Sequence, residues 1–273
     1  MHADPVAAAA FRALAASAPD VRALLREHRR GAADAHPDDA VDDLLADRLA
    51  AVDGVGELAS EEATAVRDCG TGYGVTLDPV DGSSNLAGAA AVGTVVGVYD
   101  APLPARGRDL VGAGYLVYGS TARLVVADDE VRAYDVADGD PELAASGLTL
   151  PEPPEVFAFR WMPDRWPDGF AAFAREVAAD CTQRYTGAMV ADVDLVLGRG
   201  GLYAYPALRD APDGKLRLQY EANPVAHLVE AAGGRGSDGE RPLLDVEPTG
   251  LHQRVPMHVG NAGLVRRLES HLR

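Results

Sequence analysis

Two aspartates, Asp78 and Asp81, lie three residues apart in the stretch TLDPVDGSSNLAG. Pro79 fixes the backbone between them, so we expect a turn that brings both carboxylates to face one point. Gly82 then allows a backbone N–H group to approach a ligand, and the two serines that follow are typical of a helix start, which attracts anions. Such residues also occur in ordinary turns between strands. Their combination suits a phosphate bridged by a hard divalent cation, which prefers oxygen ligands.

Further acids stand elsewhere in the chain. Glu61 and Glu62 occur in ASEEA, and Glu221 occurs in LQYEANP, where an apolar strand meets an apolar helix. Adjacent glutamates are usually a solvated surface, but an unpaired carboxylate at the position of Glu221 would be costly. If these acids converge on Asp78 and Asp81, they raise one another's pKa unless a cation neutralises them. The pattern therefore predicts a two-metal phosphoryl-transfer site.

Cationic and hydroxyl side chains are available for a second anionic group. Lys215 is the only lysine, and Arg184 and Arg217 stand in CTQRYTGAMV and GKLRLQYE. Arginines are most often surface ion pairs, but a lysine kept in an arginine-rich chain indicates a need for a compact, flexible charge. Tyr185 and Tyr205 are candidate hydroxyl donors, although isolated tyrosines are more often half-buried packing residues.

Composition limits the partners and the compartment. The 273 residues carry a formal net charge of −17, with 42 acids against 25 Lys and Arg, which argues against nucleic acid or an anionic membrane as partner. The acidic, arginine-rich composition indicates a salt-adapted, halophilic protein that loses stability without salt. Cys69 and Cys181 fit neither a disulfide framework nor a zinc site, and we expect two buried thiols. Because no signal peptide or membrane span is evident, we expect a cytoplasmic location.

The hydrophobic pattern predicts an α/β protein. It is helical up to about Asp53, and strands follow from Gly72 onward, rich in β-branched residues. The segment 138–156, rich in Pro, Gly and acids, is the predicted boundary. Beyond it we expect helices in GFAAFAREVAADC, MVADVDLVLGRG and NPVAHLVEAAGG, and extended segments in GLYAYPA and KLRLQYE.

These segments resemble the class I fructose-1,6-bisphosphatase family, within the lithium-sensitive, metal-dependent sugar phosphatases. The shared motifs are ASEEA, TLDPVDGSSNL, LVGAGYLVYGSTARLVV, RYTGAMVADV, GGLYAYPA and GKLRLQYEANPVAHLVEAAGG, in the family's order. The resemblance implies a layered α/β/α/β/α fold with an N-terminal metal-binding half, 1–150, and a C-terminal substrate-binding half, 151–273. It implies hydrolysis of the 1-phosphate of D-fructose 1,6-bisphosphate in gluconeogenesis. It also implies two or three Mg²⁺ ions per site, with Mn²⁺ as a substitute, and a homo-oligomer, dimer or tetramer.

The resemblance also implies residue roles. Metal ligands would be Glu61, Asp78, Asp81, Glu221 and the carbonyl of Val80. Glu62, aided by Asp43, would deprotonate the attacking water. Substrate would contact Asp81, Gly82, Ser83, Ser84, Arg184, Tyr185, Met189, Tyr205, Lys215 and Arg217, with Arg184 reaching it from a neighbouring subunit.

Several departures from the family pattern leave alternatives open. An asparagine that contacts the 6-phosphate in the family is absent from FAFRWMPDRW, so Arg160 takes its role or the contact is lost. Asp43 is the best match to the family's catalytic aspartate, but the contributions of Asp38, Asp39 and Asp42 cannot be fixed. The usual AMP-binding residues are missing, so AMP inhibition is not expected. Alternative functions are hydrolysis of sedoheptulose 1,7-bisphosphate or inositol monophosphate, and a non-catalytic sugar-phosphate-binding regulator.

Overall fold

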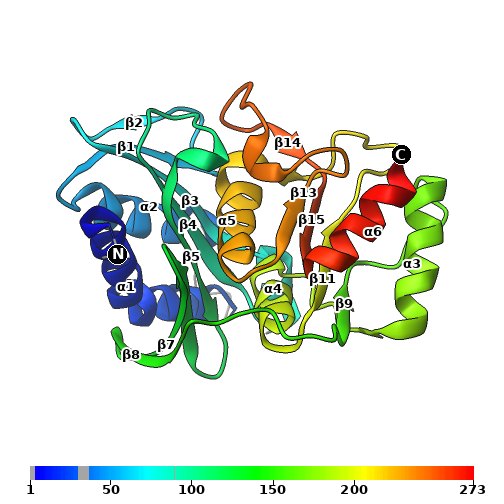
Figure 1. Cartoon of the computed structure of the whole chain (residues 1–273). Coiled ribbons are helices and arrows are strands. Elements are labelled where there is room, and N and C mark those ends of the chain that lie inside the picture. Colours follow the sequence, from blue (N-terminus) through cyan, green and yellow to red (C-terminus); the bar gives the residue numbers. More distant parts are fainter. Residues whose placement is uncertain (1–3, 30–36, 89) are drawn as a thin grey trace.

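The computed structural model describes residues 4–29, 37–88 and 90–273 and shows five layers (Figure 1). Two helices, α1 (Pro5–Arg29) and α2 (Pro37–Ala50), cover the outer face of the first sheet. Helices α4 (Met189–Arg199) and α5 (Asn223–Ala231) lie between the two sheets, where both pack on strands of each. Helices α3 (Asp168–Asp180) and α6 (Ala262–Leu272) pack together on the far side of the second sheet. The predicted α/β/α/β/α layering is therefore confirmed.

The first sheet has eight strands in the order β2-β1-β3-β4-β5-β6-β7-β8. Only β1 and β3 pair in parallel; the other neighbours are antiparallel. Strand β4 is buried along its whole length, as expected for a β-branched strand covered on both faces. The bounds are β1 (Val55–Ser60), β2 (Arg67–Asp68), β3 (Tyr73–Asp81), β4 (Gly93–Tyr99), β5 (Leu110–Tyr118), β6 (Ala122–Ala127), β7 (Val131–Ala137) and β8 (Asp140–Ser146).

The second sheet has five strands in the order β10-β9-β11-β15-β13, and β12 pairs with β14 in a separate ribbon. Strands β10, β9 and β11 run parallel, so their carboxyl ends meet at one edge. The bounds are β9 (Val156–Ala158), β10 (Thr182–Gln183), β11 (Gly201–Tyr205), β12 (Leu216–Arg217), β13 (Arg235–Ser237), β14 (Arg254–Val255) and β15 (Met257–Gly260). Short helical turns complete the chain: η1 (Ser83–Gly88), η2 (Gly107–Asp109), η3 (Leu218–Ala222) and η4 (Leu243–Asp245).

Three local expectations differ from the structure. The predicted boundary segment contains β8, which extends the first sheet, so only the part after Ser146 connects the two sheets. The segment KLRLQYE is extended only at Leu216–Arg217, and then becomes the π-helical turn η3. Cys181 is buried, but Cys69 is only partly buried.

The division at residue 150 into two domains stays a prediction, because one core cluster combines side chains from both halves. Within the described residues, none of the helices has both the length and the apolar character that crossing a bilayer requires.

Candidate active site

A cavity of about 200 Å³ brings together nearly all the predicted site residues. Only Asp43 and Arg184 of that set do not line it. Three residues that the sequence did not single out also line it: Gly187, Tyr203 and Leu216. Asp38, which the sequence left open as an alternative to Asp43, lines it as well. Tyr203 could have been found, because it stands two residues before Tyr205 in a strand, and such residues share one face.

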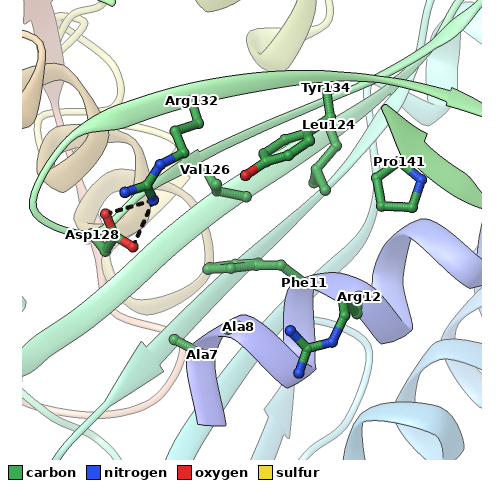
Figure 2. A pocket seen from close by; sticks show the side chains of 10 residues that line it. All are labelled: Ala7, Ala8, Phe11, Arg12, Leu124, Val126, Asp128, Arg132, Tyr134 and Pro141. Atoms are coloured by element: carbon green, nitrogen blue, oxygen red, sulfur yellow. Dashed lines mark hydrogen bonds and ion pairs between the residues drawn. The ribbon is translucent and has the colours of Figure 1, made fainter. Parts of the chain in front are cut away.

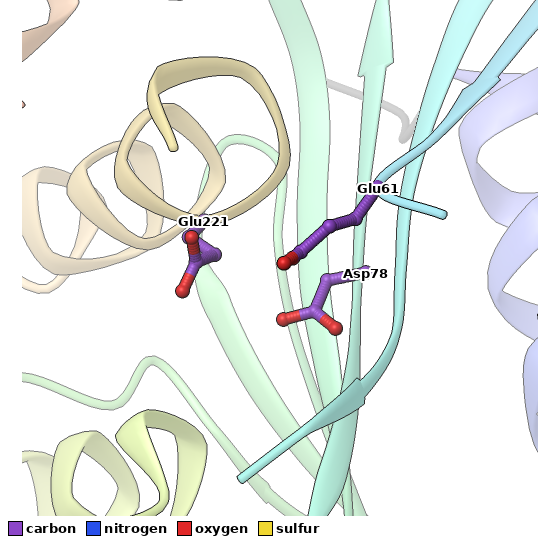
Figure 3. A group of neighbouring side chains, drawn as sticks. All are labelled: Glu61, Asp78 and Glu221. Carbon is purple, nitrogen blue, oxygen red and sulfur yellow. The ribbon is translucent and has the colours of Figure 1, made fainter. Parts of the chain in front are cut away.

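Three carboxylates form the acidic end of the cavity (Figure 3). Glu61 follows the end of β1, Asp78 lies within β3, and Glu221 lies in η3. One oxygen of each lies within 4.8 Å of one oxygen of the others. Sequence segments more than a hundred residues apart therefore supply one cluster of oxygen ligands.

Burial and mutual repulsion make this cluster costly while it is charged. Asp78 is 4% exposed and Glu221 6% exposed. Burial, together with the charges of Asp81 and Glu221, raises the pKa of Asp78 well above its ordinary value. Burial raises the pKa of Glu221 to about 7, against hydrogen bonding from the Arg217 backbone. Oxygen-only ligands that need positive charge fit Mg²⁺ or Mn²⁺.

Asp81 reaches the same cavity by a β-bulge rather than by the expected turn. Strand β3 continues to Asp81, and its pairing with β4 shifts: Asp78 faces Val95 and Asp81 faces Gly93. Residues three apart on a regular strand point to opposite faces, but one extra residue puts both on the same face. Thr94 Oγ1 donates to the carbonyl of Pro79 at 2.8 Å and holds the bulge.

The Asp81 side chain is anchored to helix α4. Its Oδ2 accepts a hydrogen bond from the Val190 N–H at 2.8 Å, in the first turn of the helix. Burial raises the pKa of Asp81 to about 6, and hydrogen bonds from Val190 and Met189 oppose the rise. Asp81 therefore borders the three-carboxylate cluster and links it to the second half of the chain.

Gly82 is required by the close approach of this turn to α4. Its φ is +78°, and a Cβ there would lie 2.5 Å from the Cβ of Ala188. Any side chain would push β3 away from the amino end of α4. The turn η1 that follows is a short 3₁₀ helix, so the helix expected after Ser83 is confirmed in a tighter form.

Arg217 binds the carboxylates directly. Its guanidinium forms an ion pair with Glu61, and its backbone N–H donates to Glu221 Oε2 at 2.6 Å. The prediction placed Arg217 among the substrate contacts; in the structure it also neutralises the acidic end of the cavity.

Another part of the cavity wall carries hydroxyl groups and a cation. Lys215 Nζ lies 5.7 Å from the centre of the Tyr205 ring. Tyr185 is partly buried, and burial raises its pKa to about 12, so the phenol stays protonated and can donate a hydrogen bond. This wall is suited to a second polar or anionic group of a ligand.

Helix α2 presents Asp38, not Asp43, to the cavity. Asp43 is exposed and does not line it, whereas Asp38 does. The two residues are five apart, so they differ by about 140° around the helix axis. Asp42, only about 40° from Asp38 by the same geometry, accepts a hydrogen bond from Ser60 next to Glu61. Glu62 is exposed at the cavity rim.

Arg184 stands outside the cavity of its own chain. It is exposed, and its Nη1 donates to the carbonyl of Gln183 at 3.0 Å. Its predicted contribution from a neighbouring subunit stays a prediction.

A second cavity, of about 260 Å³, lies between α1 and strands β6 to β8 (Figure 2). It is lined mainly by apolar side chains such as Phe11 and Leu124. Its Arg132 is paired with Asp128 at 2.9 Å. Within the described residues, the only carboxylate cluster with metal-ligand geometry is that of Glu61, Asp78 and Glu221. The first cavity is therefore the candidate active site.

Comparisons with known proteins agree with this site. The family "Fructose-1-6-bisphosphatase, N-terminal domain" matches residues 29–140, and "Fructose-1-6-bisphosphatase, C-terminal domain" matches residues 150–273. A class 1 fructose-1,6-bisphosphatase of Halobacterium salinarum is 46% identical over 276 residues, covering 97% of this chain and 96% of the relative. That of Haloarcula marismortui is 41% identical over 268 residues, covering 95% and 92%.

A solved structure shows the same fold. The holo form of Leishmania major fructose-1,6-bisphosphatase superposes with a TM-score of 0.91 at 26% identity, over 99% of this chain and 95% of that one. With two family domains covering most of its length and a close overall likeness in structure, the chain belongs to the class 1 fructose-1,6-bisphosphatase family.

Proposed function

We propose that this protein hydrolyses the 1-phosphate of D-fructose 1,6-bisphosphate to give fructose 6-phosphate and phosphate. The observation that carries the proposal is the group of three converging carboxylates, Glu61, Asp78 and Glu221, in a cavity that Lys215 and Tyr205 also line. Family membership supports the same reaction. A gluconeogenic role agrees with this chemistry.

The carboxylates would hold two or three Mg²⁺ ions, with Asp81 and the Val80 carbonyl completing the ligand set. Bound metal would supply Lewis acidity toward the phosphoryl oxygens and lower the pKa of a water molecule. The bulge in β3 orients Asp78 and Asp81 toward one side, so the chain provides the ligands in a preformed arrangement. Before any ion binds, Arg217 compensates Glu61, and we expect this pair to open on metal binding.

The protein's own groups would orient the attack and hold the ends of the sugar. Glu62 would accept the proton of the attacking water, and Asp38 takes the assisting role predicted for Asp43, because Asp38 is the one that lines the cavity. The backbone N–H groups of Gly82, Ser83 and Ser84 would bind the oxygens of the 1-phosphate.

Tyr185, Tyr205 and Lys215 would bind the sugar and its 6-phosphate, with Met189 against the sugar ring. Arg184 would complete this end of the site from a neighbouring subunit. A homodimer or homotetramer is therefore part of the proposal, as is a location in the cytoplasm.

The decisive experiment is phosphate release from fructose 1,6-bisphosphate in concentrated KCl, with and without Mg²⁺. We expect strong release that EDTA abolishes and Mg²⁺ or Mn²⁺ restores. Sedoheptulose 1,7-bisphosphate and inositol monophosphate serve as competing substrates. If either is hydrolysed in preference to fructose 1,6-bisphosphate, it is the substrate instead. If no phosphate is released from any of the three, the result favours a sugar-phosphate-binding regulator.

A further inference from the structure

Five residues, 184–188, connect β10 to α4 beside the candidate active site without regular secondary structure. Tyr185 and Gly187 of this segment line the cavity. The segment is anchored to the second sheet where it begins, because the Arg184 N–H donates to the Phe157 carbonyl at 2.8 Å. The described residues between that bond and α4 belong to neither a strand nor a helix. Other bonds must therefore decide where Tyr185 lies.

The backbone of Thr186, in the middle of the segment, is bound by two side chains from different halves of the chain. Its N–H donates to Asp192 Oδ1 at 2.8 Å, and its carbonyl accepts a hydrogen bond from Asn85 Nδ2 at 3.1 Å. Asp192 lies in the first turn of α4, and Asn85 lies in η1 next to Ser84. These two bonds hold the segment between η1 and α4, directly beside Tyr185.

Asp192 is a costly residue at this position. Its side chain is fully buried, and within the described part of the chain no cationic side chain forms an ion pair with it. Burial raises its pKa to about 6, and hydrogen bonding from Thr186 opposes the rise. A buried carboxylate without a cation costs free energy that an apolar residue of similar size would not. Packing of α4 alone would favour such a residue, so the bond to Thr186 is the feature that distinguishes the aspartate.

We infer that Asp192 is a positioning residue for substrate binding: through the N–H of Thr186 it holds Tyr185 at the cavity, and it does not itself touch the substrate. Tyr185 lines the cavity and Asp192 does not. The inference rests on the proposed function, in which Tyr185 binds the sugar. Without the carboxylate the Thr186 N–H loses its acceptor, and the substrate would have to order the segment when it binds, which lowers affinity.

The test compares Asp192→Leu, which is similar in size but has no acceptor, with Asp192→Asn, which keeps an oxygen for the Thr186 N–H. Steady-state rates on fructose 1,6-bisphosphate are measured in concentrated KCl with saturating Mg²⁺. We expect Asp192→Leu to raise KM about tenfold or more, the loss typical of a hydrogen bond to a charged group, and to change kcat less than about threefold. Asp192→Asn should keep KM within about threefold of wild type, because the acceptor is restored.

Asp194→Leu is the matched control, because Asp194 belongs to the same helix and also accepts hydrogen bonds. Its Oδ1 accepts from Tyr115 Oη and from Arg123 Nε, at 3.0 Å each, and both partners lie in the first sheet. This variant should lower Tm and leave KM within about twofold of wild type, because the bonds that it removes do not reach the segment 184–188.

A double-mutant cycle with Tyr185→Phe separates positioning from a general loss of stability. Tyr185→Phe removes the hydroxyl group through which Asp192 is inferred to act. In that background Asp192→Leu should raise KM by a clearly smaller factor than in the wild-type background, because both changes affect the same contact. Equal factors in the two backgrounds would show that Asp192 does not act through Tyr185, and would overturn the inference.

Hydrogen exchange of the metal-free protein separates the inference from the proposed function, because it needs neither catalysis nor ligand. The Thr186 amide should exchange at least about tenfold faster in Asp192→Leu than in wild type, and close to the wild-type rate in Asp192→Asn. If wild type releases no phosphate, the proposed function fails, and these rates with calorimetric binding of fructose 6-phosphate still test the inference. Unchanged exchange in Asp192→Leu, an unchanged KM, or an equal loss of affinity in Asp192→Leu and Asp192→Asn refutes it. If Asp192→Leu does not fold, Asp192→Ala takes its place in every comparison.

Discussion

Replacing Asp78 with asparagine should stabilise the metal-free protein while removing its activity. Asp78→Asn keeps the shape of the side chain and removes one of three negative charges whose nearest oxygens lie within 4.8 Å. At that separation two full charges repel by about 3.5 kcal/mol at an effective dielectric constant of about 20, and by about 0.9 kcal/mol in water. Arg217 already compensates Glu61, so the main gain comes from the pairs with Asp81 and Glu221.

The raised pKa of Asp78 reduces this gain, because it favours the uncharged carboxyl when no metal is bound. We therefore expect a gain of about 1–3 kcal/mol in the free energy of unfolding without metal. For a chain of this length that corresponds to an increase in Tm of roughly 2–6 °C. With Mg²⁺ the wild type should have the higher Tm, because it gains metal-binding free energy that the variant cannot gain.

The assay is thermal unfolding in EDTA and in Mg²⁺, with phosphate release measured on the same samples. Asp192→Asn is the control, since Asp192 is also buried with a raised pKa but is outside the three-carboxylate group. It should keep the Mg²⁺-dependent increase in Tm. If Asp78→Asn unfolds at the same temperature as wild type in EDTA, or keeps the full response to Mg²⁺, the reasoning about repulsion is wrong.

The remaining predictions concern pH, positioning and salt. Glu221 is protonated below about pH 7 when folded but only below its ordinary 4.5 when unfolded. The metal-free protein should therefore lose about 3 kcal/mol of stability as the pH rises from about 4.5 to about 7, and a urea midpoint that stays constant from about pH 5 to 7 would contradict this. Gln219→Leu leaves the buried N–H and C=O of Ala105 unpaired, and should cost about 2–4 kcal/mol in urea unfolding and raise the Mg²⁺ concentration for half-maximal activity. Asp38→Asn should lower kcat at least about tenfold and Asp43→Asn should not, as steady-state rates would reveal. Removing KCl should lower Tm, because the net charge of −17 is then unscreened; full stability in dilute buffer would disprove salt adaptation.

The sequence alone determined the chemistry of the site and most of the elements. Carboxylates beside a glycine and serine turn, with one retained lysine, indicate oxygen ligands for a metal and a place for an anion. Hydrophobic periodicity located the helices α1 to α5, because amphipathic spacing is a local property of the chain. The converging residues could be named because each type has few chemical roles.

Only the tertiary structure decided how these residues face one another. The bulge that turns Asp78 and Asp81 to one side depends on pairing with β4, and the π-helical turn at Glu221 depends on Gln219 binding the backbone of Ala105, 114 residues away. Likewise, the face of α2 that meets the cavity selects Asp38 over Asp43. Sequence spacing cannot show such choices, because strand register and helix rotation are fixed by packing against distant segments.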